Sequence, residues 1–346
     1  MSKKFDTITG KELMDKDLPP TRRIVERFLP QGLHILAGAP KVGKSWLTLW
    51  LCLQVAKGEP VWRLPTEKGT TLYLCLEDSL NRIQERLSVL TDEAPSNIHF
   101  ATIAETINGG IITQLENFII ETPDVALNAI DTLQCIRNAS GDMNAYAADY
   151  RDINLLKEIT KKYNVAIILV HHLRKQGDSD VFNMISGSTG LTGGADGSYI
   201  IVNDPKNPSQ RKLRAKGRDI EEVIFTLEFD KDTGIWDFIS DDSDDPFSLA
   251  DDKAISAVID FIKSEINFAG TASELAEQLK ITTKPNILSR RLFDNKMALE
   301  NMGIKVNRLR TAERRGIILE YNPPSDDDDD DNDDKNGSDP VSESSS

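Results

Sequence analysis

Three groups of polar residues in this chain have the types and spacing needed for phosphate chemistry. The first is the run Gly38-Ala39-Pro40-Lys41-Val42-Gly43-Lys44-Ser45, which fits G-x-x-x-x-G-K-[ST] and is followed by Trp46. Glycines let backbone N–H groups approach phosphate oxygens, and a helix N-terminus adds a positive dipole. We expect Lys44 to reach the β- and γ-phosphates and the Ser45 hydroxyl to bind Mg²⁺. The pattern therefore predicts a site for ATP and Mg²⁺ over residues 38–46, with a chance match as the alternative.

The second group consists of carboxylates that follow apolar runs. Hydrolysis of ATP needs an acid that orients the metal and a base for the attacking water. Asp131 ends the run Val125–Ile130 and is expected to be the Walker B aspartate. Glu77 follows a similar run and is expected to polarise the water, whereas Asp78 is expected to cap a helix beginning near Leu80. Ordinary capping by both acids is the alternative for Glu77 and Asp78.

The third group is a histidine pair, His171 and His172, at the end of the run Val165–Val170. We expect His171, ahead of its neighbour, to contact the γ-phosphate; a strand-end histidine satisfied by the backbone is the alternative. A zinc site is not expected, because the four histidines and three cysteines show no ligand spacing.

The elements that position these groups can be read from the hydrophobic pattern. Before residue 240, apolar strand-like runs alternate with helical patterns, which indicates a parallel sheet covered by helices. The expected strands are His34–Ala37, Thr71–Leu76, Val125–Ile130, Val165–Val170, Tyr199–Val202, Val223–Phe229 and Ile235–Ile239. The expected helices are Ser45–Ala56, Leu80–Leu90 and Tyr150–Tyr163. The predicted fold class is α/β, a P-loop core with a mostly parallel sheet flanked by helices.

Acidic residues mark the expected domain boundaries. The net charge is −15. Residues 323–346 carry nine Asp and one Glu against one Lys, and residues 240–252 carry six Asp and no base, so the rest of the chain is neutral. We expect an ATPase domain over 1–239 with a short N-terminal segment 1–30, an acidic linker over 240–252, and a disordered acidic tail over 323–346.

Residues 253–322 are expected to form a second, small domain. Twelve Lys or Arg against eight Asp or Glu give this stretch a net charge of +4. Helical patterns over Lys253–Ile266, Ala272–Leu279 and within Lys284–Met302 precede two strand-like runs, Lys305–Arg310 and Gly316–Tyr321. Three helices followed by a hairpin is the order of a winged helix-turn-helix.

Composition bounds the class of protein. The three cysteines, Cys52, Cys75 and Cys135, are odd in number and widely spaced, which favours reduced thiols. No apolar run approaches the roughly 18–20 residues of a membrane span. The first twenty residues have no apolar core of a signal peptide. We expect a cytoplasmic protein without a membrane partner.

Taken together, the motifs resemble the RepA-type ATPases of plasmids, phages and integrative elements, within the RecA-like group. The resemblance covers about residues 18–239. It is carried by Leu18-Pro19-Pro20, Phe28-Leu29-Pro30-Gln31-Gly32-Leu33, Leu74-Cys75-Leu76-Glu77-Asp78-Ser79, Ile130-Asp131-Thr132-Leu133-Gln134 and Val170-His171-His172-Leu173-Arg174-Lys175. Asn128 departs from the apolar strand of that family. The stretch Ile281–Glu320 is similar to the tail domain of many such proteins from Gram-positive bacteria.

The resemblance implies a hexameric, ring-forming ATPase that unwinds DNA at a replication fork. It gives the phosphate, Mg²⁺, catalytic and Walker B roles to the residues already named for them. It also implies that Lys216 and Arg218 reach the γ-phosphate bound by an adjacent subunit, with Arg218 as an arginine finger. On composition alone, the stretch Arg211–Arg218 is a basic surface run.

Basic residues in two regions are candidates for DNA contact. In RecA-like rings the loops after the strand tips line the central channel, so we expect Arg174 and Lys175 to contact phosphates of single-stranded DNA. A loop without nucleic-acid contact is the alternative. In the winged-helix-like domain, contact with duplex DNA is expected from the four arginines Arg290, Arg291, Arg314 and Arg315, with protein docking as the alternative.

The leading hypothesis is an ATP-driven DNA motor, a ring-forming helicase in the replication of a mobile genetic element. Its cofactors would be ATP and Mg²⁺, and its partners DNA and further copies of the chain. One alternative is an ATPase that loads or regulates a replication or recombination protein without unwinding DNA. Another is an ATP-responsive DNA-binding regulator. The acidic tail is expected to shield a basic surface or to recruit a basic replication protein.

Overall fold

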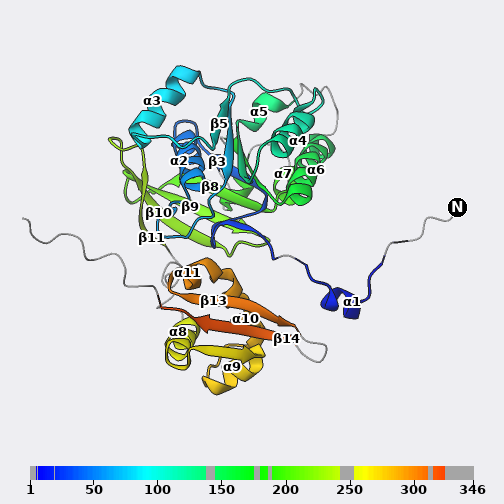
Figure 1. Cartoon of the computed structure of the whole chain (residues 1–346). Helices are drawn as coiled ribbons and strands as arrows, with labels where there is room; N and C mark the ends of the chain where they lie inside the picture. The colour runs from blue at the N-terminus through cyan, green and yellow to red at the C-terminus, as the bar shows by residue number, and fades with distance from the viewer. Residues whose placement is uncertain are drawn as a thin grey trace, which may run out of the picture. The chain divides into compact units, whose positions relative to one another are not determined.

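The structure is a computed structural model that describes residues 5, 7–18, 20–137, 145–174, 180–185, 189–241, 253–310 and 315–323. The chain divides into two compact units, Met1–Asp252 and Lys253–Ser346 (Figure 1). Residues 242–252 of the predicted linker and 324–346 of the predicted tail lie outside the described residues. Each unit is described by itself below.

Unit 1 is built on a nine-stranded sheet with the order β11-β10-β9-β8-β3-β7-β6-β4-β5. The strands from β8 to β5 run parallel, whereas β9, β10 and β11 continue the sheet in antiparallel order. Their bounds are β3 Gly32–Gly38, β4 Thr70–Cys75, β5 Ile98–Ala101, β6 Val125–Asp131, β7 Ala166–His172, β8 Gly197–Asn203, β9 Gln210–Gly217, β10 Val223–Phe229 and β11 Trp236–Asp241. A separate two-stranded ribbon joins β1 (Arg23–Val25) to β2 (Leu29–Pro30).

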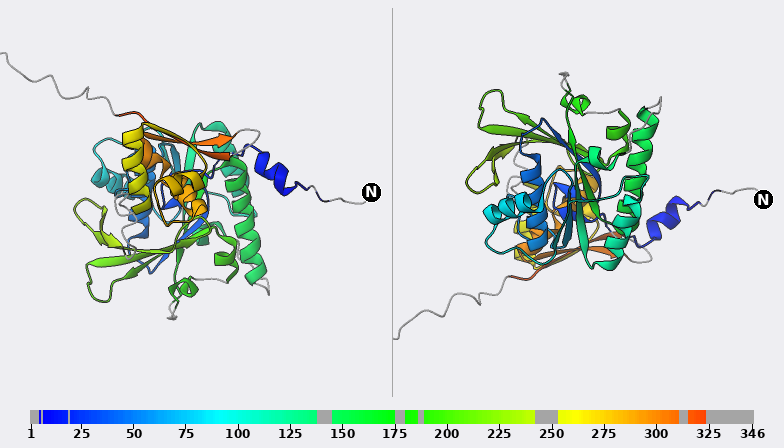
Figure 2. Two further views of the ribbon diagram at one scale, coloured as in Figure 1. Left: turned by 90° about the horizontal axis from the view of Figure 1, so that it is seen from below. Right: turned by 90° about the horizontal axis from the view of Figure 1, so that it is seen from above.

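Helices cover both faces of this sheet, as the two views of Figure 2 show. On one face α2 (Lys44–Lys57) and α3 (Leu80–Leu90) share an apolar core with the sheet that includes Leu53 and Ile83. On the other face a second core includes Leu115 and Leu156. It is covered by α4 (Ile111–Glu121), α5 (Leu133–Ile136), α6 (Ala145–Tyr163) and α7 (Thr189–Gly194). The predicted α/β class with a mostly parallel sheet is therefore confirmed.

Parallel pairing explains why the central strands are apolar on both sides. All seven residues of β3 are buried, and so are all seven of β6. Because these strands run in the same direction, their carboxyl ends meet at one edge of the sheet. Gly38, Cys75, Asp131 and His172 are the last residues of β3, β4, β6 and β7, and all four lie at this edge.

Before the sheet, α1 (Gly10–Asp15) is a single short helix with a capping box between Thr9 and Glu12. All of its residues are exposed. No helix in the described ranges combines the length and the apolar composition that crossing a lipid bilayer requires.

Unit 2 packs helices against a small antiparallel sheet of order β12-β14-β13. Its elements are α8 (Lys253–Glu265), β12 (Asn267–Gly270), α9 (Ala272–Gln278), α10 (Pro285–Asp294), α11 (Lys296–Asn301), β13 (Ile304–Arg310) and β14 (Arg315–Tyr321). Fully buried side chains such as Ile262, Leu288 and Leu319 form its core. The strand β12 was not predicted from the sequence. The region predicted to hold one helix contains two, α10 and α11.

Candidate active site

The glycine-rich run forms the loop between β3 and α2. Gly38 is the last residue of β3, and Gly43 is the N-cap of α2 with a φ of 103°, a conformation that favours glycine. A Cβ on Gly38 would lie 2.8 Å from Cγ1 of Val42. Gly38 therefore has no room for a side chain. The backbone N–H groups of the loop lead into the first turn of α2. Within the loop Ala39, Pro40 and Lys41 are exposed, whereas Val42 is buried.

Lys44 is buried, and its side chain bends back onto the loop. Its Nζ donates to the carbonyl oxygens of Gly38 at 3.0 Å and Ala39 at 3.1 Å. Burial lowers the pKa of Lys44, while the nearby carboxylates of Asp131 and Glu77 act to raise it. An anion in the loop would replace two neutral carbonyls with a charged partner, which makes stronger hydrogen bonds to an ammonium.

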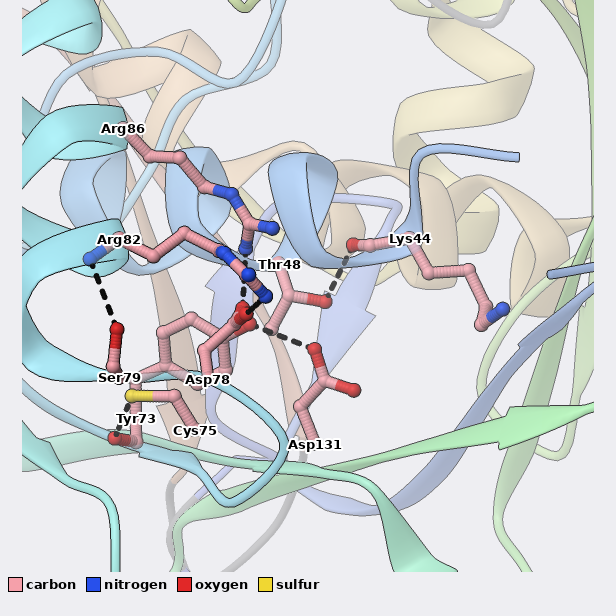
Figure 3. Close-up of polar contacts among 9 residues, drawn as sticks. All are labelled: Lys44, Thr48, Tyr73, Cys75, Asp78, Ser79, Arg82, Arg86 and Asp131. Carbon is pink, nitrogen blue, oxygen red and sulfur yellow. Dashed lines mark hydrogen bonds and ion pairs between the residues drawn. The ribbon is translucent and has the colours of Figure 1, made fainter. Parts of the chain in front are cut away.

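Asp131 is held at the carboxyl end of β6 by two hydroxyl groups. Its Oδ2 accepts a hydrogen bond from the Tyr73 hydroxyl at 2.8 Å (Figure 3), and the Ser45 side chain also hydrogen-bonds to it. Burial raises the pKa of Asp131, and these two hydrogen bonds oppose that rise. A hydroxyl beside a carboxylate provides the oxygen ligands that Mg²⁺ prefers, so the donor set of Ser45 and Asp131 fits this cation.

Removing the hydroxyl that holds Asp131 should weaken metal-dependent nucleotide binding. Tyr73→Phe removes a hydrogen bond that lowers the pKa of Asp131, so the pKa of Asp131 should rise further. More carboxyl is then protonated at a given pH, and the acidic limb of the ATPase pH profile should move to higher pH. A hydrogen bond to a charged group contributes about 1.5–3 kcal/mol to stability, and because this bond exists without the cation, only part of it should appear as lost Mg²⁺-dependent affinity, up to about tenfold at neutral pH.

The matched control is Tyr163→Phe, which removes a hydroxyl that contacts Glu116 instead. Calorimetric titration with Mg·ATP and pH–rate profiles of the three proteins provide the comparison. An unchanged acidic limb in Tyr73→Phe would show that this hydroxyl does not act on the metal site.

Glu77 follows β4 and is positioned by a residue that follows β6. The Thr132 Oγ1 donates to Oε1 of Glu77 at 3.0 Å, and Cys135 Sγ lies 3.9 Å from the same oxygen. Glu77 is an exposed residue. The ends of β4 and β6, which pair side by side, thereby bring Glu77 close to Asp131.

Asp78 does not cap the helix that follows it, so that prediction is wrong. The N-cap of α3 is Ser79, whose extended backbone lets its Oγ accept from the backbone N–H of Arg82. The Asp78 carboxylate instead forms ion pairs with two arginines of α3, Arg82 at 2.8 Å and Arg86 at 2.5 Å (Figure 3).

These groups line one polar cavity of about 180 Å³. Its walls are formed by Ser45, Cys75, Glu77, Asp78, Arg82, Arg86 and Asp131. The sequence-predicted Ser45, Glu77 and Asp131 are thus brought together beside the phosphate-binding loop. The arginines, Tyr73 and Thr132 were not predicted. Arg82 and Arg86 lie four residues apart on one helix face after Asp78, and this spacing was a signal that could have found them.

The two histidines at the end of β7 point to opposite faces of the sheet. His171 shares its face with Ile167 and Leu169, which belong to the core covered by α6. His172 is level with Gly38 and lies on the α2 face, which also carries Lys44. Its Nδ1 is buried, without a hydrogen-bond partner in the described part of the chain. The strand alternation therefore favours His172 over the predicted His171 as a residue near the phosphates.

Arg218 lies near the amino ends of the parallel strands, whereas the phosphate-binding loop follows the carboxyl end of β3. Across β8, Gly217 is level with His34, near the start of β3, whereas the loop begins after Gly38 at its end. Four residues of strand separate these levels by about 13 Å. The Arg218 side chain is 65% exposed, and its Nη1 lies 3.7 Å from Oδ1 of Asp196. Arg218 therefore cannot serve the nucleotide site of its own chain.

Lys216 lies one position before Gly217 in β9 and forms a 3.5 Å ion pair with Glu222. Its Nζ also lies 5.6 Å from the centre of the Phe182 ring. Lys216 is thus an exposed neighbour of Arg218 and not a part of the cavity.

The residues predicted to contact DNA are only partly described. Arg174 is exposed after β7, at the same edge as the loop, and Lys175 lies outside the described residues. Arg290 and Arg291 are exposed on α10. Arg315 begins β14, but its side chain is not among the described groups, and Arg314 lies outside the described residues.

Comparisons with known proteins agree with this fold. The ATPase domain of G40P has a similar structure, with a TM-score of 0.50 and 16% identity over 62% of this chain and 86% of that one. A DnaB-like replicative helicase, whose structure was solved with its interactions with primase, gives a TM-score of 0.50 and 17% identity over 63% of this chain and 58% of that one. No curated protein sequence matches the chain.

A family model described as an AAA domain, AAA_25, matches residues 4–178, which is just over half of the chain. This range contains the phosphate-binding loop, Glu77, Asp131 and both histidines of β7. The chain therefore belongs to the AAA domain family AAA_25, and its fold is that of a RecA-like P-loop ATPase domain.

Proposed function

We propose that this protein is an ATP-hydrolysing DNA motor, a ring-forming helicase that acts in the replication of a mobile genetic element. The observation that carries the proposal is the single cavity where Ser45, Glu77 and Asp131 meet beside Lys44. Fold similarity to the G40P ATPase domain and to a DnaB-like replicative helicase supports it. The setting in a mobile element rests on the resemblance to RepA-type ATPases.

Different residues of the site bind different parts of Mg·ATP. Bound there, Mg·ATP supplies the γ-phosphorus that water attacks and part of the charge neutralisation. The backbone N–H groups of residues 38–45 bind phosphate oxygens at the α2 N-terminus. Lys44 exchanges the carbonyl oxygens of Gly38 and Ala39 for phosphate oxygens. Ser45 and Asp131 hold the cation through oxygen ligands, with Tyr73 fixing the orientation of Asp131.

Glu77 is the group that accepts a proton from the attacking water. Thr132 fixes Oε1 by a hydrogen bond, which leaves Oε2 to take the proton. His172, on the α2 face of β7, contacts the γ-phosphate in place of the predicted His171. Arg218 and Lys216 act on the site of a neighbouring subunit, because Arg218 lies at the far edge of the sheet from its own loop.

Strand displacement on a forked DNA duplex tests the proposal directly. The wild-type chain should displace one strand only in the presence of ATP and Mg²⁺. Lys44→Ala should abolish displacement, because it removes the phosphate-binding cation. ATPase activity stimulated by single-stranded DNA, without displacement, would replace the helicase with an ATPase that loads another protein. Duplex binding with little turnover would indicate an ATP-responsive regulator.

Unit 2 is proposed to be a winged-helix domain that contacts duplex DNA. Leu288 and Leu292 are fully buried, and they fix α10 so that Arg290 and Arg291 are exposed. Arg308 of β13 lies over the ring of Phe293 of α10, 4.7 Å from its centre. This cation–π contact joins the basic strand to the basic helix and makes one positive surface from two elements.

Arg290→Ala/Arg291→Ala should weaken duplex binding by about one to two orders of magnitude near 0.15 M salt. Each lost phosphate contact should also reduce the slope of log K against log salt by about one. Fluorescence anisotropy with duplexes of several sequences, over a range of salt, measures both quantities. The control with the same charge change is Lys253→Ala/Lys263→Ala, two exposed residues of α8. Equal losses in the two double variants would show a general charge effect and no site on α10.

The ring, a hexamer in the RepA-type resemblance, is proposed to enclose single-stranded DNA near Arg174 and Lys175. The acidic tail is proposed to bind a basic replication protein or to cover the basic surface of unit 2. Removal of residues 325–346 with no change in DNA affinity or partner binding would leave the tail only a solubilising role.

A further inference from the structure

A reciprocal pair of glycine–tryptophan contacts joins the phosphate-binding loop to the β10–β11 hairpin. In the loop, a Cβ on Gly43 would lie 2.4 Å from Cζ2 of Trp236 in β11. In the hairpin turn, a Cβ on Gly234 would lie 2.3 Å from Cζ3 of Trp46 in the first turn of α2. Both glycines have positive φ, 103° and 69°. Each tryptophan ring therefore rests directly on a backbone that only glycine can provide.

Further contacts hold the hairpin side of this arrangement. Phe229, at the end of β10, packs against Trp236 with ring centres 5.0 Å apart and against Trp46 at 5.9 Å. The indole N–H of Trp62 donates to the backbone carbonyl of Trp236 at 2.7 Å. Trp236 is only 1% exposed although β11 is an outer strand of the sheet. We name Phe229, Gly234 and Trp236 the hairpin clamp.

The hairpin clamp also connects to the polar cavity of the candidate active site. The guanidinium of Arg86 lies 5.7 Å from the centre of the Trp46 ring, and it forms the ion pair with Asp78 in the cavity wall. Trp46 thus lies between the hairpin turn and a cavity-lining arginine. The indole N–H of Trp236 is buried without a partner in the described residues, so its placement is not explained by its own hydrogen bonding.

We propose that the hairpin clamp positions the phosphate-binding loop for nucleotide binding, with Trp236 and Gly234 as positioning residues. The inference rests on the nucleotide binding included in the proposed function. Gly43 and Trp46 flank Lys44 and Ser45, so a shift of either contact moves the two residues that hold phosphate and metal. Occupation of the loop must in turn change the surroundings of Trp46 and Trp236.

Gly234→Ala tests the positioning role. The added methyl group meets the Trp46 ring and sits at a φ of 69°, so the turn must withdraw from α2. Affinity for Mg·ATP should fall about 10- to 100-fold, because small displacements of a binding group have effects of this size. The loss of affinity should appear as a higher KM for ATP, while kcat at saturating ATP should stay within about threefold of wild type. Asp232→Ala, an exposed residue of the same turn, is the matched control.

Intrinsic fluorescence gives a readout that general destabilisation would not imitate. The chain contains four tryptophans. Addition of Mg·ADP to the wild type should change the emission. Trp46→Phe and Trp236→Phe should each lose a large part of that change. Trp50→Phe should keep it, since Trp50 packs on Trp62 and not on the loop.

The outcomes separate this inference from the proposed function. A wild-type chain that fails to bind Mg·ATP in calorimetry would overturn both. Normal wild-type binding, together with unchanged KM in Gly234→Ala or an unchanged emission response in the Trp46 and Trp236 variants, would overturn the clamp alone.

Discussion

Replacing Glu77 with Gln should reduce ATP hydrolysis by about 10²- to 10⁴-fold, the usual contribution of a general base. Gln has the same shape, and its amide oxygen can still accept the hydrogen bond from Thr132. It cannot take a proton from water, so the chemical step fails while the phosphate-binding loop is untouched. Steady-state phosphate release measures the rate, and calorimetry with Mg·ATP should give an affinity within about threefold of wild type.

Lys44→Ala is the companion variant that separates binding from chemistry. It removes the ammonium that bonds to the loop carbonyls, and nucleotide affinity should fall together with hydrolysis. If Glu77→Gln retained hydrolysis within a few-fold of wild type, Glu77 would not be the base. In that case Asp78 would be the next carboxylate to consider, because it lines the same cavity.

Arg218→Ala should lower ATP turnover by about 10³- to 10⁵-fold in the assembled protein, the range for loss of an arginine finger. Nucleotide binding should persist, since Arg218 lies at the far edge of the sheet from its own loop. The fold should also persist, because Asp196 keeps its 2.6 Å ion pair with Lys157. Turnover, binding and size in solution are measured on the same preparation.

Mixing two inactive variants makes this prediction sharper. Arg218→Ala carries an intact loop, and Lys44→Ala carries an intact arginine, so a mixed ring contains some complete sites. An equal mixture should recover about a quarter of the wild-type rate if subunits assemble at random. The double variant mixed with either single variant is the control and should recover nothing. No recovery in the first mixture, with mixed assemblies demonstrated, would place Arg218 outside the neighbouring site.

The hydrophobic pattern predicted the central strands well because buried parallel strands are continuous apolar runs. Val125–Ile130 and Val165–Val170 differ from β6 and β7 by only one or two residues at their ends. β9 was not predicted, because four of its eight residues are Arg or Lys. In the structure Leu213 and Ala215 are fully buried, whereas Lys212, Arg214 and Lys216, which alternate with them along the strand, are less buried. The basic composition of this strand hid its alternation.

The residues that carry the proposed chemistry were easier to predict than the residues that hold them in place. Lys44, Ser45, Glu77 and Asp131 each follow or precede a recognisable strand, and parallel strands bring such ends to one edge. The contacts of Tyr73 with Asp131 and of Thr132 with Glu77 span 58 and 55 residues. They depend on β4 lying beside β6, an order in space that differs from the order in the chain. The contact between Gly43 and Trp236 crosses most of unit 1, and no local spacing indicates it.

The place of β11 at the end of the sheet leads to an expectation about nucleotide release. In the described sheet it is hydrogen-bonded to β10 on one side, and it is the last element of unit 1 before the segment that leads to unit 2. The phosphate-binding loop is therefore held at two points. One is the central strand β3, and the other is Trp236 in the outer strand β11. A pull along the chain from unit 2 would act on the single row of hydrogen bonds between β11 and β10 before it acted on β3, which is paired on both sides. If the hairpin clamp positions the loop as proposed, we expect tension between the units to weaken nucleotide binding before the core unfolds.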